Sequence, residues 1–191
     1  EQEPRADDLL SRSKPIEGSS VKLLSPEDNL LQVCLHTAKH SFVRAPGFRL
    51  HTDVDRIVAC EIIDWDIFVQ KVKELQIRTA CYFSLAMART LLKSDIPVSV
   101  LDAISPPNWK RRLMTAWLDK VGIFNPDDPK WSNAGYILFV ALLFDRPSDL
   151  LSGVFPPLEE MKRRYDGVTR LNAPLFHTRR LFSLVARRTG I

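Results

Sequence analysis

The 191-residue sequence has little of what marks a secreted, metal-thiolate or membrane-spanning protein. Its three cysteines are odd in number and show no C-x-x-C spacing, so Cys34, Cys60 and Cys81 are predicted to be buried free thiols in a reducing cytoplasm. Its longest nearly pure apolar run, residues 134–144, falls short of the roughly 20 residues that cross a membrane. We therefore expect a cytoplasmic protein that has no membrane partner, with that run as a buried core helix.

The first twelve residues, EQEPRADDLLSR, lack a starting methionine as well as the basic and apolar regions of a signal peptide. We interpret Glu1 as a position inside a longer protein. Residues 1–23 are expected to form an irregular N-terminal segment, and residues 24–191 a single helical domain. With 45% hydrophobic and 26% charged residues, the composition is that of a folded globular chain.

Runs in which Val, Ile or Thr alternate with polar residues are also scarce, and SSVKLL is the one strand candidate. Helix signals are abundant instead. Ser25, followed by Pro26 and two acids, is a good N-cap, and Asp64 is another. The predicted fold class is therefore all-α: a compact multi-helix bundle with at most a short remnant strand near residues 19–23.

Apolar residues recur at helical spacing in several segments. We predict helices over residues 49–60, 64–76 and 78–92, and shorter ones that start near Pro97 and Pro106. The segment 78–92 is apolar around most of its circumference and is predicted to be central. The predicted inward faces consist of Leu30, Leu31, Cys34, Leu35, Ala38 and Phe42 after the first cap, Leu50, Val54, Ile57 and Val58 in the next helix, and Ile67, Phe68, Val72 and Leu75 after the second cap.

His36 and His40 lie one helical turn apart, on the side of their helix opposite its predicted core face. An i, i+4 histidine pair can bind zinc, but HTAKH lacks the glutamate of the H-E-x-x-H motif. A third ligand would have to come from His51 or Asp53. Two other interpretations of the histidine pair stay open besides a metal site: a structural polar contact, and a contact with phosphate or with another domain.

Asp53 has Arg49 four residues before it and Arg56 three after, which is the spacing of a surface ion-pair cluster on a helix. The two D-x-D pairs, at residues 53–55 and 64–66, match a metal-binding pattern in which both carboxylates leave one face of a strand. In a helix the two side chains point about 200° apart. We therefore predict no catalytic residue in either pair.

Five segments follow one another along the chain: LSPEDNLLQVCLHTAKHSF, FRLHTDVDRIV, IDWDIFVQKVKELQIRTACYFSLAMARTLL, IPVSVLDAI and GVFPPLEEMKRRY. Together they resemble the helical C-terminal half of the uncharacterised nucleotidyltransferase family found in bacterial genomes. The resemblance extends from about Leu24 to Tyr165, and its first segment is the most specific part.

The resemblance implies a nucleotidyltransferase palm followed by a helical domain, with Mg²⁺ and a nucleoside triphosphate used by the intact family protein. A palm needs a Gly-Ser turn shortly before paired acids on a strand, because the acids hold Mg²⁺ while the turn cradles the triphosphate. Gly18-Ser19 is the only Gly-Ser pair here, and no such strand follows it. We expect the palm to be missing, so that this chain has no catalytic residues, cofactor or metal site of its own.

Under this hypothesis the chain is a helical accessory or substrate-binding domain whose partner is the missing palm. The candidates for contacting the palm or its nucleotide are His36, His40, Asp53, Arg49 and Arg56. Two alternatives stay open: a non-enzymatic interaction module, and a metal-dependent phosphohydrolase-like helical domain.

Positive charge gathers near the C-terminus, where residues 161–191 contain eight basic residues and one acid. The predicted last helix, from about Asn172 to Arg188, is amphipathic, and a solvated basic face is its simplest interpretation. A polyanion site for nucleotide phosphate or an acidic partner is the alternative. Nucleic acid is disfavoured, because few aromatic residues are interleaved for base stacking. The candidates for polyanion binding are Arg163, Arg164, Arg179 and Arg180.

Overall fold

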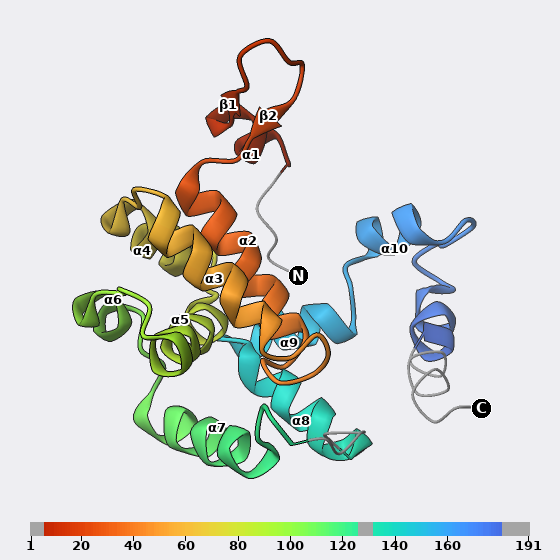
Figure 1. Ribbon diagram of the computed structural model, residues 1–191. Helices are drawn as coiled ribbons and strands as arrows, with labels where there is room; N and C mark the ends of the chain where they lie inside the picture. Colours follow the sequence, from red (N-terminus) through yellow and green to blue (C-terminus); the bar gives the residue numbers. More distant parts are fainter. Residues whose placement is uncertain (1–5, 126–131, 181–191) are drawn as a thin grey trace.

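The computed structural model describes residues 6–125 and 132–180 (Figure 1). Helices dominate these residues, which confirms the all-α prediction. One antiparallel hairpin pairs β1 (Lys14–Pro15) with β2 (Lys22–Leu23), and β2 lies where the sequence predicts a remnant strand. The helices are α1 (Ala6–Arg12), α2 (Pro26–Lys39), α3 (Arg49–Cys60), α4 (Trp65–Glu74), α5 (Arg78–Leu92), α6 (Val98–Ala103), α7 (Asn108–Val121), α8 (Asn133–Leu143), α9 (Pro147–Val154) and α10 (Leu158–Arg164), followed by a helical stretch over 173–180.

Local sequence signals set several of the helix ends. The Ser25 hydroxyl accepts a hydrogen bond from the Asp28 backbone N–H, and the Asp64 carboxylate accepts from the N–H groups of Asp66 and Ile67. Both predicted N-caps are confirmed, since each satisfies donors that the first turn of a helix leaves free. The predicted bounds 49–60 and 78–92 coincide with those of α3 and α5.

Helix α5 is the centre of the fold, as its apolar circumference predicts. It packs against α2, α3, α4, α6 and α8. Its buried side chains merge with those of α2, α3, α4 and α6 in one cluster, in which each large apolar residue contributes roughly 1.5–3 kcal/mol. The fully buried members of this cluster include Leu30, Leu31, Cys34, Val54, Phe68, Val72, Cys81, Leu85 and Ala88.

A second buried cluster joins α7 and α8 to this bundle. Phe42, in the loop after α2, places its ring centroid 5.8 Å from that of Phe83 in α5 and 6.1 Å from that of Phe139 in α8. Met114 and Leu118 contribute to the same cluster from α7. These ring separations are typical of favourable aromatic pairs. One aromatic layer therefore holds α8 against the N-terminal helices.

The predicted inward face of α4 is wrong at one residue. Phe68 and Val72 are fully buried and Leu75 packs beside them, but Ile67 is 44% exposed. At about 100° per residue, Ile67 lies well outside the arc that Phe68 and Val72 define. Trp65 packs against the core cluster in its place.

The apolar run at residues 134–144 is only partly buried, which corrects the prediction of a core helix. Phe139 is fully buried in α8, but Ile137 and Leu138 are each 56% exposed. The physical reason is position, because the packing of α8 against α5 and α7 covers only part of its circumference. None of the described helices is long and apolar enough to cross a membrane.

Residues 6–23 form α1 and the hairpin, whereas the sequence suggests an irregular segment. A buried carboxylate ties α1 to the bundle. Asp28 in α2 accepts hydrogen bonds from Arg12 Nε and Lys71 Nζ, both at 2.8 Å. Burial opposes the ionisation of Asp28, but the hydrogen bonds from Arg12 and Lys71 outweigh it, so the pKa of Asp28 is lowered. The division of the chain at residue 24 stays a prediction.

The three cysteines differ in accessibility, which corrects the prediction that all are buried. Cys34 and Cys81 are buried, but Cys60, at the end of α3, is exposed. A hydrogen bond with Cys34, together with burial, raises the pKa of Cys81 well above the usual value. We expect one thiol of the folded protein to react rapidly with Ellman's reagent, and all three in denaturant. Cys60→Ser should remove the rapid phase, and a rapid phase of two thiols would contradict this assignment.

Asp28→Asn should lower the free energy of unfolding by about 2–3 kcal/mol, because it removes the buried partner of two cations. The lowered pKa gives the pH dependence. The contribution of the ionised carboxylate is full above the unfolded-state pKa of about 3.9, and it is lost as pH falls through the lower folded-state pKa. Urea unfolding from pH 7 to pH 3 should show the wild-type advantage shrinking at the acid end. The exposed control Asp66→Asn should show no comparable loss at pH 7.

Candidate functional site

The side chains of His36 and His40 point away from the core of α2, as predicted. His36 is exposed and His40 half-buried, and their ring centroids lie 4.8 Å apart in an edge-to-face arrangement. Both occur at the C-terminal end of α2, where the helix dipole favours positive charge. We call these two side chains the histidine pair. It is accessible to a partner or a ligand.

His51 is a core residue, which rules it out as an accessible third ligand. It is fully buried at the start of α3, and its Nε2 lies 2.8 Å from the Phe42 backbone oxygen. Because a carbonyl oxygen accepts, Nε2 carries the proton in this bond. Burial lowers the pKa of His51 more than the hydrogen bond to Phe42 raises it, so the ring is neutral at pH 7. His51 fastens the loop between α2 and α3 to the core.

Arg49, Asp53 and Arg56 are all exposed on α3. The sequence spacing suggests a cluster of ion pairs, but no ion pair within 4 Å joins Asp53 to either arginine. The residues that the structure describes include no group of three His, Cys, Asp or Glu placed to hold a metal ion. The side chains of Arg49, Asp53 and Arg56 are therefore accessible for contacts with a ligand or a partner.

Both D-x-D pairs lie in helical surroundings, as predicted. Asp53 and Asp55 are in α3, and the Asp55 carboxylate accepts a 2.6 Å hydrogen bond from the Ser94 hydroxyl. Asp64 caps α4, and Asp66 follows within its first turn. Neither pair presents two carboxylates on one face.

The basic C-terminal candidates have different surroundings. Arg163 and Arg179 are exposed, and the side chain of Arg164 lies outside what the structure describes. Arg180 donates hydrogen bonds to the carbonyl oxygens of Val154 (2.7 Å) and Gly153 (3.0 Å), which end α9. Arg180 thus caps a helix C-terminus. The predicted last helix begins at residue 173, and its part beyond 180 falls outside the described residues.

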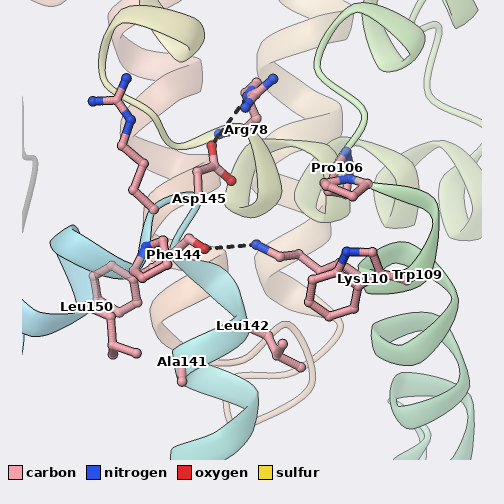
Figure 2. Close-up of a pocket in the computed structure, with 12 residues that line it drawn as sticks. Arg78, Pro106, Trp109, Lys110, Ala141, Leu142, Phe144, Asp145 and Leu150 are labelled. Atoms are coloured by element: carbon pink, nitrogen blue, oxygen red, sulfur yellow. Dashed lines mark hydrogen bonds and ion pairs between the residues drawn. The ribbon is translucent and has the colours of Figure 1, made fainter.

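A pocket of about 300 Å³ lies between the N-terminal ends of α5 and α7 and the connection from α8 to α9 (Figure 2). The sequence patterns do not indicate it, because its residues come from distant segments. Its lining combines apolar walls with three cations and one carboxylate. The lining residues are Arg78, Pro106, Pro107, Trp109, Lys110, Ala141, Leu142, Phe144, Asp145, Arg146, Pro147 and Leu150.

Asp145, in the connection from α8 to α9, caps the N-terminal end of α5. Its Oδ2 accepts a 2.6 Å hydrogen bond from the Arg78 backbone N–H. Its Oδ1 accepts from the Thr79 N–H at 3.1 Å and from the Thr79 hydroxyl at 2.6 Å. The Arg78 guanidinium adds an ion pair at 3.6 Å. Both carboxylate oxygens of Asp145 thus accept hydrogen bonds from the first turn of α5.

Lys110 reaches from α7 toward the end of α8, as Figure 2 shows. Only 6% of the residue is exposed, and Nζ donates to the Phe144 carbonyl oxygen at 2.8 Å and to the Thr79 hydroxyl at 3.4 Å. Burial lowers the pKa of Lys110, Asp145 partly offsets this, and Arg78 adds to the lowering. The sequence does not predict the burial of Lys110, because the polar and charged segment NWKRR is typical of an exposed helix face.

Residues 1–93 match the family model described as uncharacterised nucleotidyltransferase. The matched segment includes α1 to α5, the hairpin and the histidine pair, and it is just under half of the chain. No curated protein and no solved structure matches the chain. The N-terminal half is therefore similar to a nucleotidyltransferase family, as the first three of the five sequence segments suggest, and the match begins at residue 1. It does not extend to residues 94–165.

Asp145→Ala should lower the free energy of unfolding by about 2 kcal/mol, because it leaves the first N–H groups of a buried helix without an acceptor. Denaturant unfolding measures the loss, and faster amide exchange at Arg78 and Thr79 would locate it. Asp102→Ala, at an exposed acid of α6, is the matched control. Equal stability of the two variants would mean that α5 finds another cap.

Proposed function

We propose that this chain is the helical substrate-binding part of a nucleotidyltransferase-like protein, without catalytic activity by itself. The family match over residues 1–93 carries the proposal. In the described part of the chain the only sheet is the hairpin β1–β2, so paired acids have no strand there to hold them on one face. The helices would bind or shape the site for the acceptor or nucleotide, while a palm transfers the nucleotidyl group.

The two D-x-D pairs of the described residues do not fit a catalytic Mg²⁺ site. Magnesium in such enzymes is held by carboxylates and by substrate phosphates. The described residues gather no three metal-binding side chains, and the two D-x-D pairs diverge on helices. In this proposal Mg²⁺ and the nucleoside triphosphate therefore bind to the palm rather than to this chain.

The histidine pair and the α3 side chains Arg49, Asp53 and Arg56 are the proposed contact surface. Helices α2 and α3 pack against each other, and each leaves its candidate residues accessible. The two arginines would attract nucleotide phosphate, and the imidazoles would donate hydrogen bonds to it. The palm or its bound nucleotide is the proposed partner. Exposed Arg163 and Arg179 stay candidates for a further polyanion contact.

A second candidate function is that of an interaction module in which transferase chemistry is not used. Ile137 and Leu138 on α8 favour it, because adjacent large apolar side chains are more than half exposed there. A transfer assay separates the two ideas only with a palm present. Binding of nucleotide at α2 and α3 separates them with this chain alone.

Titration of the ¹⁵N-labelled chain with ATP and with UTP tests the proposal. We expect the amide chemical shifts to change at the C-terminal end of α2 and at residues 49–56 of α3. A His36→Ala/His40→Ala variant should weaken binding about fivefold, which corresponds to losing roughly one net hydrogen bond. Lys120→Ala, at an exposed residue of α7, is the control. No labelled nucleotide should be transferred by the chain alone in the presence of Mg²⁺.

Two outcomes would count against this function. Transfer by the chain alone would make it an enzyme in its own right. An absence of nucleotide-dependent shifts at α2 and α3 would remove the substrate-binding role of this surface. Shifts confined to residues near Lys110 would instead report on the separate pocket described below.

A further inference from the structure

We propose that the pocket between α5, α7 and the α8–α9 connection binds a small anionic ligand with a flat or aliphatic apolar body. The proposal does not rest on the function proposed above. Of the lining residues, only Arg78 falls within the segment that matches the nucleotidyltransferase family. Pocket and histidine pair also belong to different elements, so each can be tested without the other.

The charge of Lys110 carries the argument. Buried cations in proteins are normally paired with an anion, because leaving water is costly for a charge. Lys110 is buried, yet both of its hydrogen-bond acceptors, Phe144 O and the Thr79 hydroxyl, are neutral. No carboxylate of the described residues lies within 4 Å of its Nζ. An anion in the pocket would complete the counter-charge, which Asp145 supplies only in part.

Asp145 supplies only part of that counter-charge, because it raises the pKa of Lys110 less than burial lowers it. Both of its oxygens accept hydrogen bonds from the first turn of α5, and its ion pair is with Arg78. It is the only acid among the lining residues, which also include Arg78, Lys110 and Arg146. The lining thus has an excess of two positive charges. A negatively charged head group is the ligand part that balances it.

The walls describe the rest of the ligand. Trp109 is 61% exposed at the pocket, and Leu142, Phe144 and Leu150 line the side formed by α8 and α9. An exposed tryptophan beside aliphatic side chains offers a surface for a ring or a short chain. The volume of about 300 Å³ is at the small end of ligand pockets. It suits a head group joined to one ring.

The shared ligand chemistry is an anion on an apolar ring, and the anion can be a carboxylate or a phosphate. Phenylacetate and phenyl phosphate represent these two sources, and neutral phenylacetamide is the matched uncharged probe. We expect calorimetric titration to show that one or both anions bind at least about tenfold more tightly than phenylacetamide. The reason is that a hydrogen bond to a charged group is stronger than one between neutral groups. The tighter of the two anions identifies the source. Equal binding of all three, or no binding of the anions at millimolar concentration, would overturn the proposal.

Lys110→Met keeps most of the length of the side chain and removes its charge. It should reduce the preference for the anion over phenylacetamide to about twofold or less. Arg112→Met, at an exposed residue two positions further along α7, is the control and should leave the preference unchanged. Retention of the full preference in folded Lys110→Met would contradict the proposal.

A third variant covers the case in which Lys110→Met fails to fold. Trp109→Ala changes an exposed wall residue and should weaken the anions and phenylacetamide by the same factor, at least about threefold, because it removes ring contact and not charge. Circular dichroism and thermal unfolding establish that each variant is folded. Unchanged binding in Trp109→Ala would show that the probes bind elsewhere, and this would also overturn the proposal.

Discussion

Helix α5 follows a residue that offers no cap. Ile77 precedes it with a hydrocarbon side chain, so the first N–H groups of this central helix need an acceptor from elsewhere. Asp145 supplies one from more than sixty residues further along the chain, and it thereby fixes where the end of α8 meets the bundle. The same contacts engage the charge of Asp145, which leaves Lys110 with neutral acceptors. Asp145 thus contributes to the electrostatics of the pocket and, together with the aromatic layer around Phe139, to the placement of α8.

Features that depend on neighbours in sequence could be predicted from sequence. The caps at Ser25 and Asp64 act within one turn of their helices, and the bounds of α3 and α5 follow from local periodicity. Exposure is different, because it depends on which distant element covers a side chain. Cys60 and the apolar run in α8 are of residue types that are usually buried. In the described part of the fold, no neighbouring element covers Cys60, Ile137 or Leu138 fully.

The histidines show the same limit within the candidate sites. A helical wheel is enough to place His36 and His40 off the core, since the apolar arc of α2 is unambiguous. It does not show that His51 is pinned by the Phe42 carbonyl, because that contact depends on how the loop before α3 folds back. The pocket could not be predicted from the sequence for a related reason. Lys110 and Arg112 are close in sequence, and only packing decides that Lys110 is buried and Arg112 exposed.

The similarity to the nucleotidyltransferase family ends at residue 93, but the interactions that complete α5 cross that point. The border of sequence similarity is therefore not a border of packing in this protein. Residues 1–93 alone would leave the N–H groups of Arg78 and Thr79 without the Asp145 acceptor, and the rings of Phe42 and Phe83 without the cover of Phe139. In this chain the second half therefore has two structural duties toward the first: it provides an acceptor at one end of α5 and an apolar cover along the side of that helix.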